Sequence, residues 1–171
     1  MSSTKEIIIN KNTFNNILQK HNLKRMQLFN NDNNMLLKLD NELNKQAQSY
    51  ANQLASSINN NTLKHSKCND YGENLYCSSN LNGDPSYAVD AWLNEESDYF
   101  KALEKYNNTT TTPLLSFSGY GHYTQCIWPN TKLLGIGIAN SKNYQYVVCQ
   151  YKPAGNIIGQ LPYTNNNNNN D

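Results

Sequence analysis

Two short segments hold most of the residues that could do chemistry: GHYTQCIW at 121–128 and YVVCQYKPAGN at 146–156. In the first segment His122 follows a glycine, a residue that lets the backbone approach a neighbour closely. Tyr123, the side-chain amide of Gln125 and a second aromatic ring come after it. An imidazole, an amide and aromatic rings together are typical of a pocket lining, and equally of a packed helix end. The residues alone leave both interpretations open.

Three helices and a hairpin are predicted to position these segments. Apolar residues recur every three or four positions over 14–28, as in an amphipathic helix of about five turns. A second helix is predicted over 40–58, with Asp40 as its N-cap. The third follows Asp84-Pro85 and runs to Phe100. The segments 133–139 and 144–151 are rich in aliphatic and aromatic residues, and the polar turn between them predicts a hairpin.

Two glycines, Gly135 and Gly137, fall on one face of the first hairpin strand. Glycine weakens the interior of a strand, so this pair indicates a place where another backbone or a ligand comes close. A bulge or a tight helix crossing is the alternative.

Composition excludes several classes of protein. The 171 residues carry a net charge of +1 without a Lys/Arg cluster, so no nucleic-acid partner is expected. Apolar runs are far shorter than the roughly 20 residues of a transmembrane segment.

A single domain is predicted over 10–163, after an N-terminal lead-in at 1–9. The asparagine-rich end at 164–171 is predicted to be a disordered tail.

The four cysteines do not reveal a redox compartment. They allow three pairings, and none forms a CxxC motif that would indicate zinc or redox chemistry. Cys68 and Cys77 either form a local bridge or remain two thiols. Cys126 and Cys149 are expected to be small buried hydrophobic residues.

Several motifs in the expected order resemble the CAP superfamily, named for cysteine-rich secretory proteins, antigen 5 and pathogenesis-related 1 proteins, and built on the SCP domain. The resemblance rests on the two segments above and on His21-Asn22 with Arg25, AQSYANQLA at 47–55, His65-Ser66, YGENLY at 71–76 and AWLNEESDYF at 91–100. It implies an α+β fold, a three-layer α-β-α sandwich in which a small, mostly antiparallel sheet lies between helices.

The resemblance also implies a central cleft lined by His65, Glu73, Glu95 and His122. Imidazole nitrogens and carboxylate oxygens suit zinc, with water completing an open coordination sphere, and His65 and His122 are the expected metal ligands. The separations of 8, 22 and 27 residues are too long for spacing alone to reveal such a site. Periodicity does not distinguish Glu95 from Glu96; the family pattern selects Glu95.

Other roles are open for some of these residues. His65 could lie in a surface loop, and His122 could bond to the backbone of a packed turn. Glu73, between Gly72 and Asn74, could accept backbone N–H bonds and hold its loop. His21 and Arg25 are expected to brace the first helix by hydrogen bonding.

The implied function is a binding protein that takes a divalent metal ion and a sterol or another lipid. Apolar contacts could come from an aromatic set in the third helix, although these residues also fit a core: Tyr87, Trp92, Tyr99 and Phe100. One alternative is a zinc-dependent hydrolase or protease, for which Ser66 and Ser79 are the candidate catalytic nucleophiles. A second alternative is a scaffold in which metal organises an interaction surface, and a homodimer is a further expected partnership.

Localisation has two interpretations. The family is mostly extracellular, but only one Lys precedes the short apolar patch Ile7–Ile9, which is too short for a secretory signal. The chain is closest in pattern to the compact, Golgi-associated pathogenesis-related-like branch, which implies a cytoplasmic location or one peripheral to Golgi membranes. Ser2 stands where N-myristoylation needs glycine, so lipid anchoring is not expected.

Overall fold

The computed structural model describes residues 11–57, 63–67, 70–107 and 117–162. The predicted lead-in at 1–9 and tail at 164–171 lie outside these residues. The helices are α1 (Lys11–Leu28), the 3₁₀ turn η1 (Asn33–Met35), α2 (Asn41–Ser56), α3 (Tyr87–Leu93), α4 (Glu96–Asn107) and α5 (Gly121–Cys126). The strands are β1 (Lys38–Leu39), β2 (Gly72–Ser78), β3 (Leu133–Asn140) and β4 (Gln145–Lys152).

The strands form one mixed sheet in the order β1-β3-β4-β2. The predicted hairpin is confirmed, because β3 and β4 pair antiparallel from Leu133↔Lys152 to Asn140↔Gln145. β2 joins β4 antiparallel, whereas β1 pairs parallel with β3. Among the described strands β2 is therefore an edge strand, and only β4 lies beside it.

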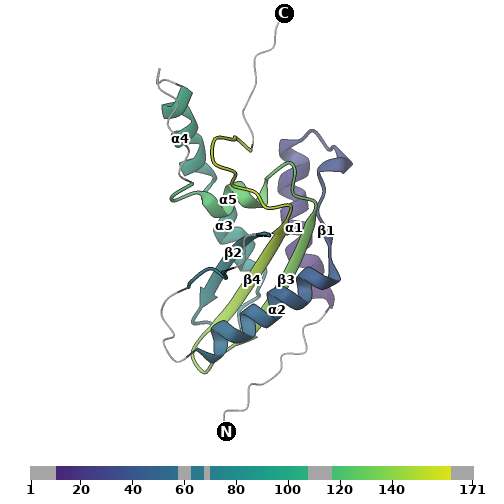
Figure 1. Cartoon of the computed structure of the whole chain (residues 1–171), viewed down its shortest axis with the longest axis vertical. Coiled ribbons are helices and arrows are strands. Elements are labelled where there is room, and N and C mark those ends of the chain that lie inside the picture. Colours follow the sequence, from purple (N-terminus) through teal and green to yellow (C-terminus); the bar gives the residue numbers. More distant parts are fainter. Residues whose placement is uncertain (1–10, 58–62, 68–69, 108–116, 163–171) are drawn as a thin grey trace, which may run out of the picture.

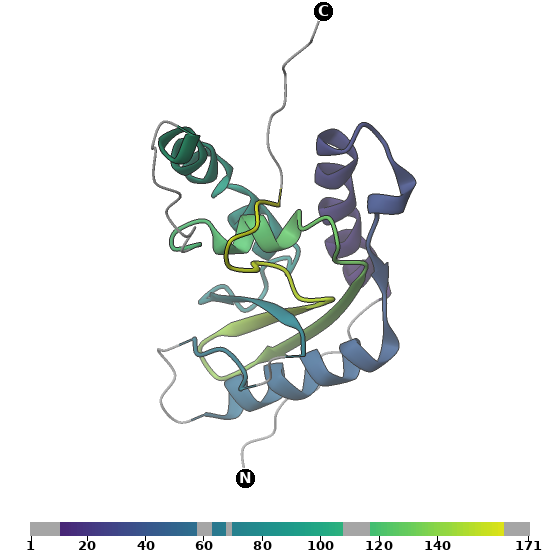
Figure 2. The same ribbon diagram turned by 45° about the horizontal axis from the view of Figure 1, so that its top comes forward.

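The sheet lies between two helical layers, which confirms the α-β-α sandwich (Figures 1 and 2). In Figure 2, α2 lies below the sheet, and α1, α3 and α5 lie above it. Asp40 caps α2 as predicted, because its side chain accepts a hydrogen bond from the Leu43 N–H at 2.9 Å.

The glycine pair of β3 marks where α2 packs on the sheet. A Cβ atom at Gly135 would lie 2.4 Å from the carbonyl carbon of Leu43, and one at Gly137 would lie 2.2 Å from that of Ala47. The backbone of α2 thus comes close enough to exclude any side chain at these positions. The alternative interpretation, a tight helix crossing, is the one observed, and the backbone that comes close is that of α2.

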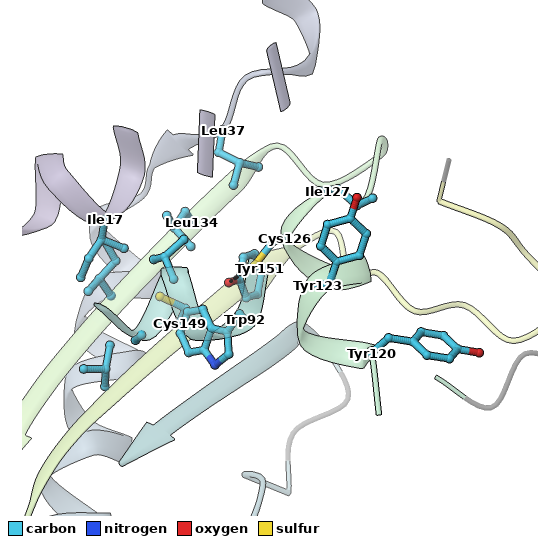
Figure 3. Close-up of a cluster of buried hydrophobic side chains, with 14 of the residues drawn as sticks. Ile17, Leu37, Trp92, Tyr120, Tyr123, Cys126, Ile127, Leu134, Cys149 and Tyr151 are labelled. Atoms are coloured by element: carbon cyan, nitrogen blue, oxygen red, sulfur yellow. Dashed lines mark hydrogen bonds between the residues drawn. The ribbon is translucent and has the colours of Figure 1, made fainter. Parts of the chain in front are cut away.

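The opposite face of the sheet carries the larger core, which includes Ile17, Trp92, Tyr123, Leu134 and Tyr151. Figure 3 shows how these side chains from α1, α3, α5, β3 and β4 converge. Cys126 and Cys149 belong to the same core at 1% and 0% exposure, so their expected burial is confirmed.

His21 and Arg25 brace α1 from within this core, as expected. His21 Nδ1 lies 2.8 Å from the Ile17 carbonyl oxygen, and His21 Nε2 lies 2.8 Å from the Tyr151 hydroxyl. Arg25 donates to the carbonyl oxygens of Cys126, Trp128 and Thr131 at 2.8–3.1 Å. The pair fastens α1 to the end of α5 and to β4.

The sequence predicts one continuous third helix, and this prediction is wrong. The chain forms α3 and α4 instead, and Asn94 and Glu95 lie at the break between them. Asn94 favours helix ends over helix interiors, and the Glu95 side chain bonds to α5 rather than lying along a helical stripe. A tertiary contact has therefore overridden the periodic pattern.

Cys77 is half-buried with a free thiol, while its expected partner Cys68 lies outside the described residues. Within the ranges described, none of the helices combines the length and apolar character needed to cross a membrane.

Candidate functional site

Glu73, near the start of β2, holds His65 and its neighbour from one side. His65 Nδ1 lies 3.0 Å from Glu73 Oε1, which also accepts the Ser66 N–H at 2.9 Å. Glu73 Oε2 accepts the amide N–H of Gln150 on β4 at 3.1 Å. Glu73 therefore holds the loop through a backbone N–H, one of the roles considered for it, and also contacts an imidazole.

The two side chains of the His65–Glu73 pair differ in solvent exposure. The His65 side chain is 61% exposed, whereas that of Glu73 is 5% exposed. The hydrogen bond to Glu73 raises the pKa of His65. Burial acts to raise the pKa of Glu73, but hydrogen bonds from His65, Ser66 and Gln150 together lower it. A fixed carboxylate thus orients an imidazole whose outer edge faces solvent.

Glu95 holds His122 through two hydrogen bonds and its neighbour Tyr123 through a third. His122 Nδ1 lies 2.7 Å from Glu95 Oε1. Glu95 Oε2 accepts the backbone N–H groups of His122 at 3.0 Å and Tyr123 at 3.1 Å. These amides belong to the first turn of α5, where backbone N–H groups lack partners within the helix. One carboxylate therefore orients the imidazole and completes the helix end.

Glu96 contacts the same helix but a different group. It accepts the Tyr123 hydroxyl at 3.0 Å and forms an ion pair with Lys24 at 2.5 Å. Glu95, and not Glu96, is therefore the acidic partner of the His122 imidazole in this structure.

Two further side chains fix the position of His122. The ring of Trp92 on α3 stacks on the imidazole, with centroids 6.3 Å apart and an interplanar angle of 16°. Asn74 donates to the His122 carbonyl oxygen at 3.0 Å and to the Tyr151 hydroxyl at 3.2 Å. Asn74 is only 1% exposed, so this network belongs to the core and ties the site to it.

The two His–Glu pairs approach the same end of β2. Successive side chains of a strand point to opposite faces of the sheet. Glu73 contacts His65, and the next residue, Asn74, contacts the backbone of His122. Two consecutive residues of β2 therefore contact the two pairs, one through a side chain and one through the backbone. Within the described residues, no three or more His, Cys, Asp or Glu side chains gather closely enough to hold a metal ion.

An open groove of about 960 Å³ lies between α2 and the segment before β2. The described residues that line it are all polar or aromatic: Glu42, Lys45, Gln46, Ser49, Tyr50, Gln53, Lys64, His65, Ser66, Lys67 and Tyr71. His65 borders this groove, whereas His122 does not.

Neither candidate serine has its hydroxyl beside a histidine that could act as its catalytic base. The Ser66 hydroxyl lies 3.3 Å from the Tyr71 hydroxyl, and Ser66 contacts Glu73 only through its backbone N–H. Ser79 follows the far end of β2, so it is about 20 Å along the strand from Glu73 at the rise of an extended chain. Neither position brings a serine hydroxyl to an imidazole.

The aromatic set considered for ligand contact divides between core and surface. Trp92 and Tyr99 are buried at 2% and 0% exposure, as expected for a core. Phe100 packs half-buried against the same core, while Tyr87 is 57% exposed.

Sequence reasoning did not single out Asn74 or Gln150. Asn74 lies inside YGENLY, next to the candidate Glu73. If this segment had been predicted as a strand, the alternation of side chains would have placed Asn74 on the face opposite to Glu73. Gln150 faces Glu73 across the β2–β4 register, which can be recognised only after the strands are paired.

Comparisons with known proteins show the family to which the chain belongs. The family model described as "CAP: Cysteine-rich secretory protein family" matches residues 18–151. Venom allergen 5 of Rhynchium brunneum is 37% identical over 136 residues, covering 72% of this chain and 54% of the allergen. Pathogenesis-related protein 1B of Nicotiana tabacum is 38% identical over 125 residues, covering 72% of this chain and 67% of the tobacco protein. The chain therefore spans about half the length of the venom allergen.

Solved structures share the fold. The structure described as "Crystal structure of NaASP2 with Zn2+" has a TM-score of 0.67 and 27% identity, covering 94% of this chain and 89% of that one. The crystal structure of MpPR-1i has a TM-score of 0.54 at 19% identity, over 85% of this chain and 90% of that one, and indicates the fold alone.

Proposed function

Because the chain belongs to the CAP family of cysteine-rich secretory proteins, we propose that it is a CAP-domain binding protein that holds a divalent metal ion, zinc, through His65 and His122. One observation carries the proposal: each imidazole presents its Nδ1 to a glutamate, at 3.0 Å for Glu73 and 2.7 Å for Glu95.

This orientation prepares both imidazoles for metal binding. When Nδ1–H of a neutral histidine donates to a carboxylate, the lone pair of Nε2 is left for a ligand. A carboxylate behind the imidazole also fixes the ring and raises its basicity, and this arrangement recurs around zinc-binding histidines. Glu73 and Glu95 would then position the ligands, while His65 and His122 supply the nitrogen atoms.

The donor set fits zinc, but only as an open site. Zinc accepts imidazole nitrogen readily, and a closed structural site uses four protein ligands. The described residues offer no group of three or more candidate ligands, so water would have to complete the coordination. Gln150 supports the presence of a polar ligand nearby, because its buried Oε1 has no hydrogen-bond partner among the described residues, while its Nε2 bonds to Glu73. The relative NaASP2 was crystallised with Zn2+.

A sterol or another lipid is the second ligand class that the family resemblance implies. The groove favours it less, because none of the described residues that line it is aliphatic. Trp92 and Tyr99, which could have supplied apolar contacts, are in the core. Metal binding is therefore the first function to test, and lipid binding the second.

A zinc-dependent hydrolase that attacks through a serine is favoured least. Covalent catalysis needs a nucleophile within hydrogen-bonding reach of a base. The Ser66 hydroxyl contacts Tyr71 instead, and Ser79 lies beyond the far end of β2.

Metal-organised association, including a homodimer, is the other alternative, in which zinc changes self-association of the protein without any turnover of a substrate.

The finer placement in the compact, Golgi-associated branch is part of the same proposal. It is supported by the Pro-Ala-Gly-Asn turn at 153–156, where Asn156 accepts the Thr124 hydroxyl at 2.7 Å and so fastens the turn to α5.

The test is isothermal titration of zinc into metal-free protein and into the His65→Ala/His122→Ala double variant. We expect saturable one-to-one binding that the double variant loses. The matched control is Ser66→Ala/Ser79→Ala, which should bind zinc as the wild type does. Binding that survives loss of both imidazoles would overturn the proposal. Ester or peptide turnover that zinc supports and the serine control abolishes would favour the hydrolase instead.

A further inference from the structure

The groove beside α2 has no role in the metal proposal, although His65 borders it. We infer that this groove is an anion-binding site for a soluble saccharide that carries sulfate or phosphate esters. The inference rests on the groove's charge, donor groups and fixed walls, and it stands whether or not zinc binds at the histidines.

Positive charge is concentrated in the groove although the chain as a whole carries only +1. Lys45 and Glu42 form an ion pair at 2.7 Å and compensate each other. Lys64 and Lys67 line the opposite wall, and within the described ranges neither has an ion-pair partner. Two uncompensated ammonium groups on one wall attract an anion, and such groups bind phosphate and sulfate as point charges.

The other wall supplies neutral donors. Gln46, Ser49 and Gln53 recur at three- and four-residue intervals, so they share one face of α2. Amide and hydroxyl groups can donate to ester oxygens and also bond to ring hydroxyls. The rings of Tyr50 and Tyr71 offer flat surfaces, and the described lining includes no aliphatic side chain. This composition fits a charged, polyhydroxylated ligand better than an acyl chain or a sterol.

The basic wall is already fixed in place. The Tyr50 hydroxyl donates to the Lys64 carbonyl oxygen and so ties the segment to α2. The Ser66 N–H bonds to Glu73 at 2.9 Å, and the Ser66 hydroxyl lies 3.3 Å from that of Tyr71. A wall that need not be ordered on binding loses less entropy when the ligand arrives. The volume of about 960 Å³ is within the range of small-ligand sites.

The experiment is calorimetric titration of sucrose octasulfate into protein depleted of metal by a chelating resin. Wild type is compared with Lys64→Gln/Lys67→Gln, which removes both uncompensated charges. The matched control is Lys105→Gln/Lys142→Gln, which removes two exposed lysines outside the groove. We expect the groove variant to bind about tenfold or more weakly, and the control to stay within about twofold of wild type.

Further measurements test where the saccharide binds and what the groove selects. His122→Ala removes a proposed zinc ligand outside the groove, so it should bind the saccharide normally and keep this inference independent of the metal proposal. Amide chemical-shift changes should concentrate at 45–53 and 64–67, which checks the location even if a variant folds poorly. Equal binding by both lysine double variants would overturn the inference. So would tighter capture by anionic lipid vesicles or by poly-glutamate, because either would show that the groove does not select a saccharide with sulfate or phosphate esters.

Discussion

Glu95 and His122 are joined through both side chain and backbone: Nδ1 of the imidazole lies 2.7 Å from Oε1 of the carboxylate, and the His122 N–H lies 3.0 Å from Oε2. The imidazole cannot turn without breaking a contact that also holds the start of α5. The same carboxylate lies at the break between α3 and α4. One residue therefore couples the helix break, the α5 terminus and the orientation of a candidate metal ligand.

Replacing either glutamate behind the histidines should weaken zinc binding without removing it. Loss of an outer hydrogen-bond partner of a metal ligand lowers affinity by roughly 10- to 100-fold. We expect this range for Glu73→Gln and Glu95→Gln in zinc titrations. Glu96→Gln is the matched control, because Glu96 contacts Tyr123 rather than the imidazole. Wild-type affinity in both glutamate variants would show that the carboxylates do not orient the ligands.

Local features of the fold were predictable from the sequence. The Asp40 cap and the β3–β4 hairpin each depend on neighbouring residues, so composition and periodicity indicate them directly. The break at Glu95 was not predictable in this way, because it accompanies contacts with backbone groups 27 and 28 residues away.

The candidate site shows the same division. The histidines and glutamates were selected only through the family resemblance, and the structure brings them together as two pairs. β2 was missed as a strand, because Gly72–Ser78 mixes polar and apolar residues and lies at an edge of the sheet. Without β2 there was no basis for assigning opposite faces to Glu73 and Asn74.

Asn74 should be important for stability although it is neither charged nor apolar. It is buried and donates to the His122 carbonyl and the Tyr151 hydroxyl. Asn74→Ala leaves these buried acceptors short of a donor, so we expect the free energy of unfolding to fall by about 1–3 kcal/mol. Urea denaturation measures this change. The exposed Asn82→Ala should stay within about 0.5 kcal/mol of wild type, and an equally small change at Asn74 would contradict its role.

A single methyl group at Gly137 should disrupt the packing of α2 on the sheet. The added Cβ would lie 2.2 Å from the Ala47 carbonyl carbon, and a helix backbone cannot move aside as a flexible side chain can. We expect Gly137→Ala to lose about 3 kcal/mol of stability, or to fail to fold. Gly121→Ala is the control, since its Cβ would meet its nearest atom at 3.5 Å. Equal melting temperatures for the two variants would contradict the close crossing.

Mild acid should destabilise the fold through His21. Burial lowers the pKa of this imidazole from 6.5 to about 4, so the unfolded chain binds more protons between these pH values. The contribution of neutral His21 is therefore complete above pH 6.5 and is lost as pH falls towards about 4. At about 1.4 kcal/mol per pKa unit, the loss is on the order of 3 kcal/mol. Urea denaturation at a series of pH values across this window measures it.

His65 affects stability in the opposite direction to His21, which makes the source of the acid effect testable. The hydrogen bond to Glu73 raises the pKa of His65, so its contribution is complete below pH 6.5 and is lost as pH rises through the folded value. His65 is largely exposed, and its effect should be small. His65→Ala should therefore retain the acid-induced loss, whereas His21→Gln should flatten it, because no group at that position then titrates. An unchanged acid dependence in His21→Gln would assign the loss to other groups.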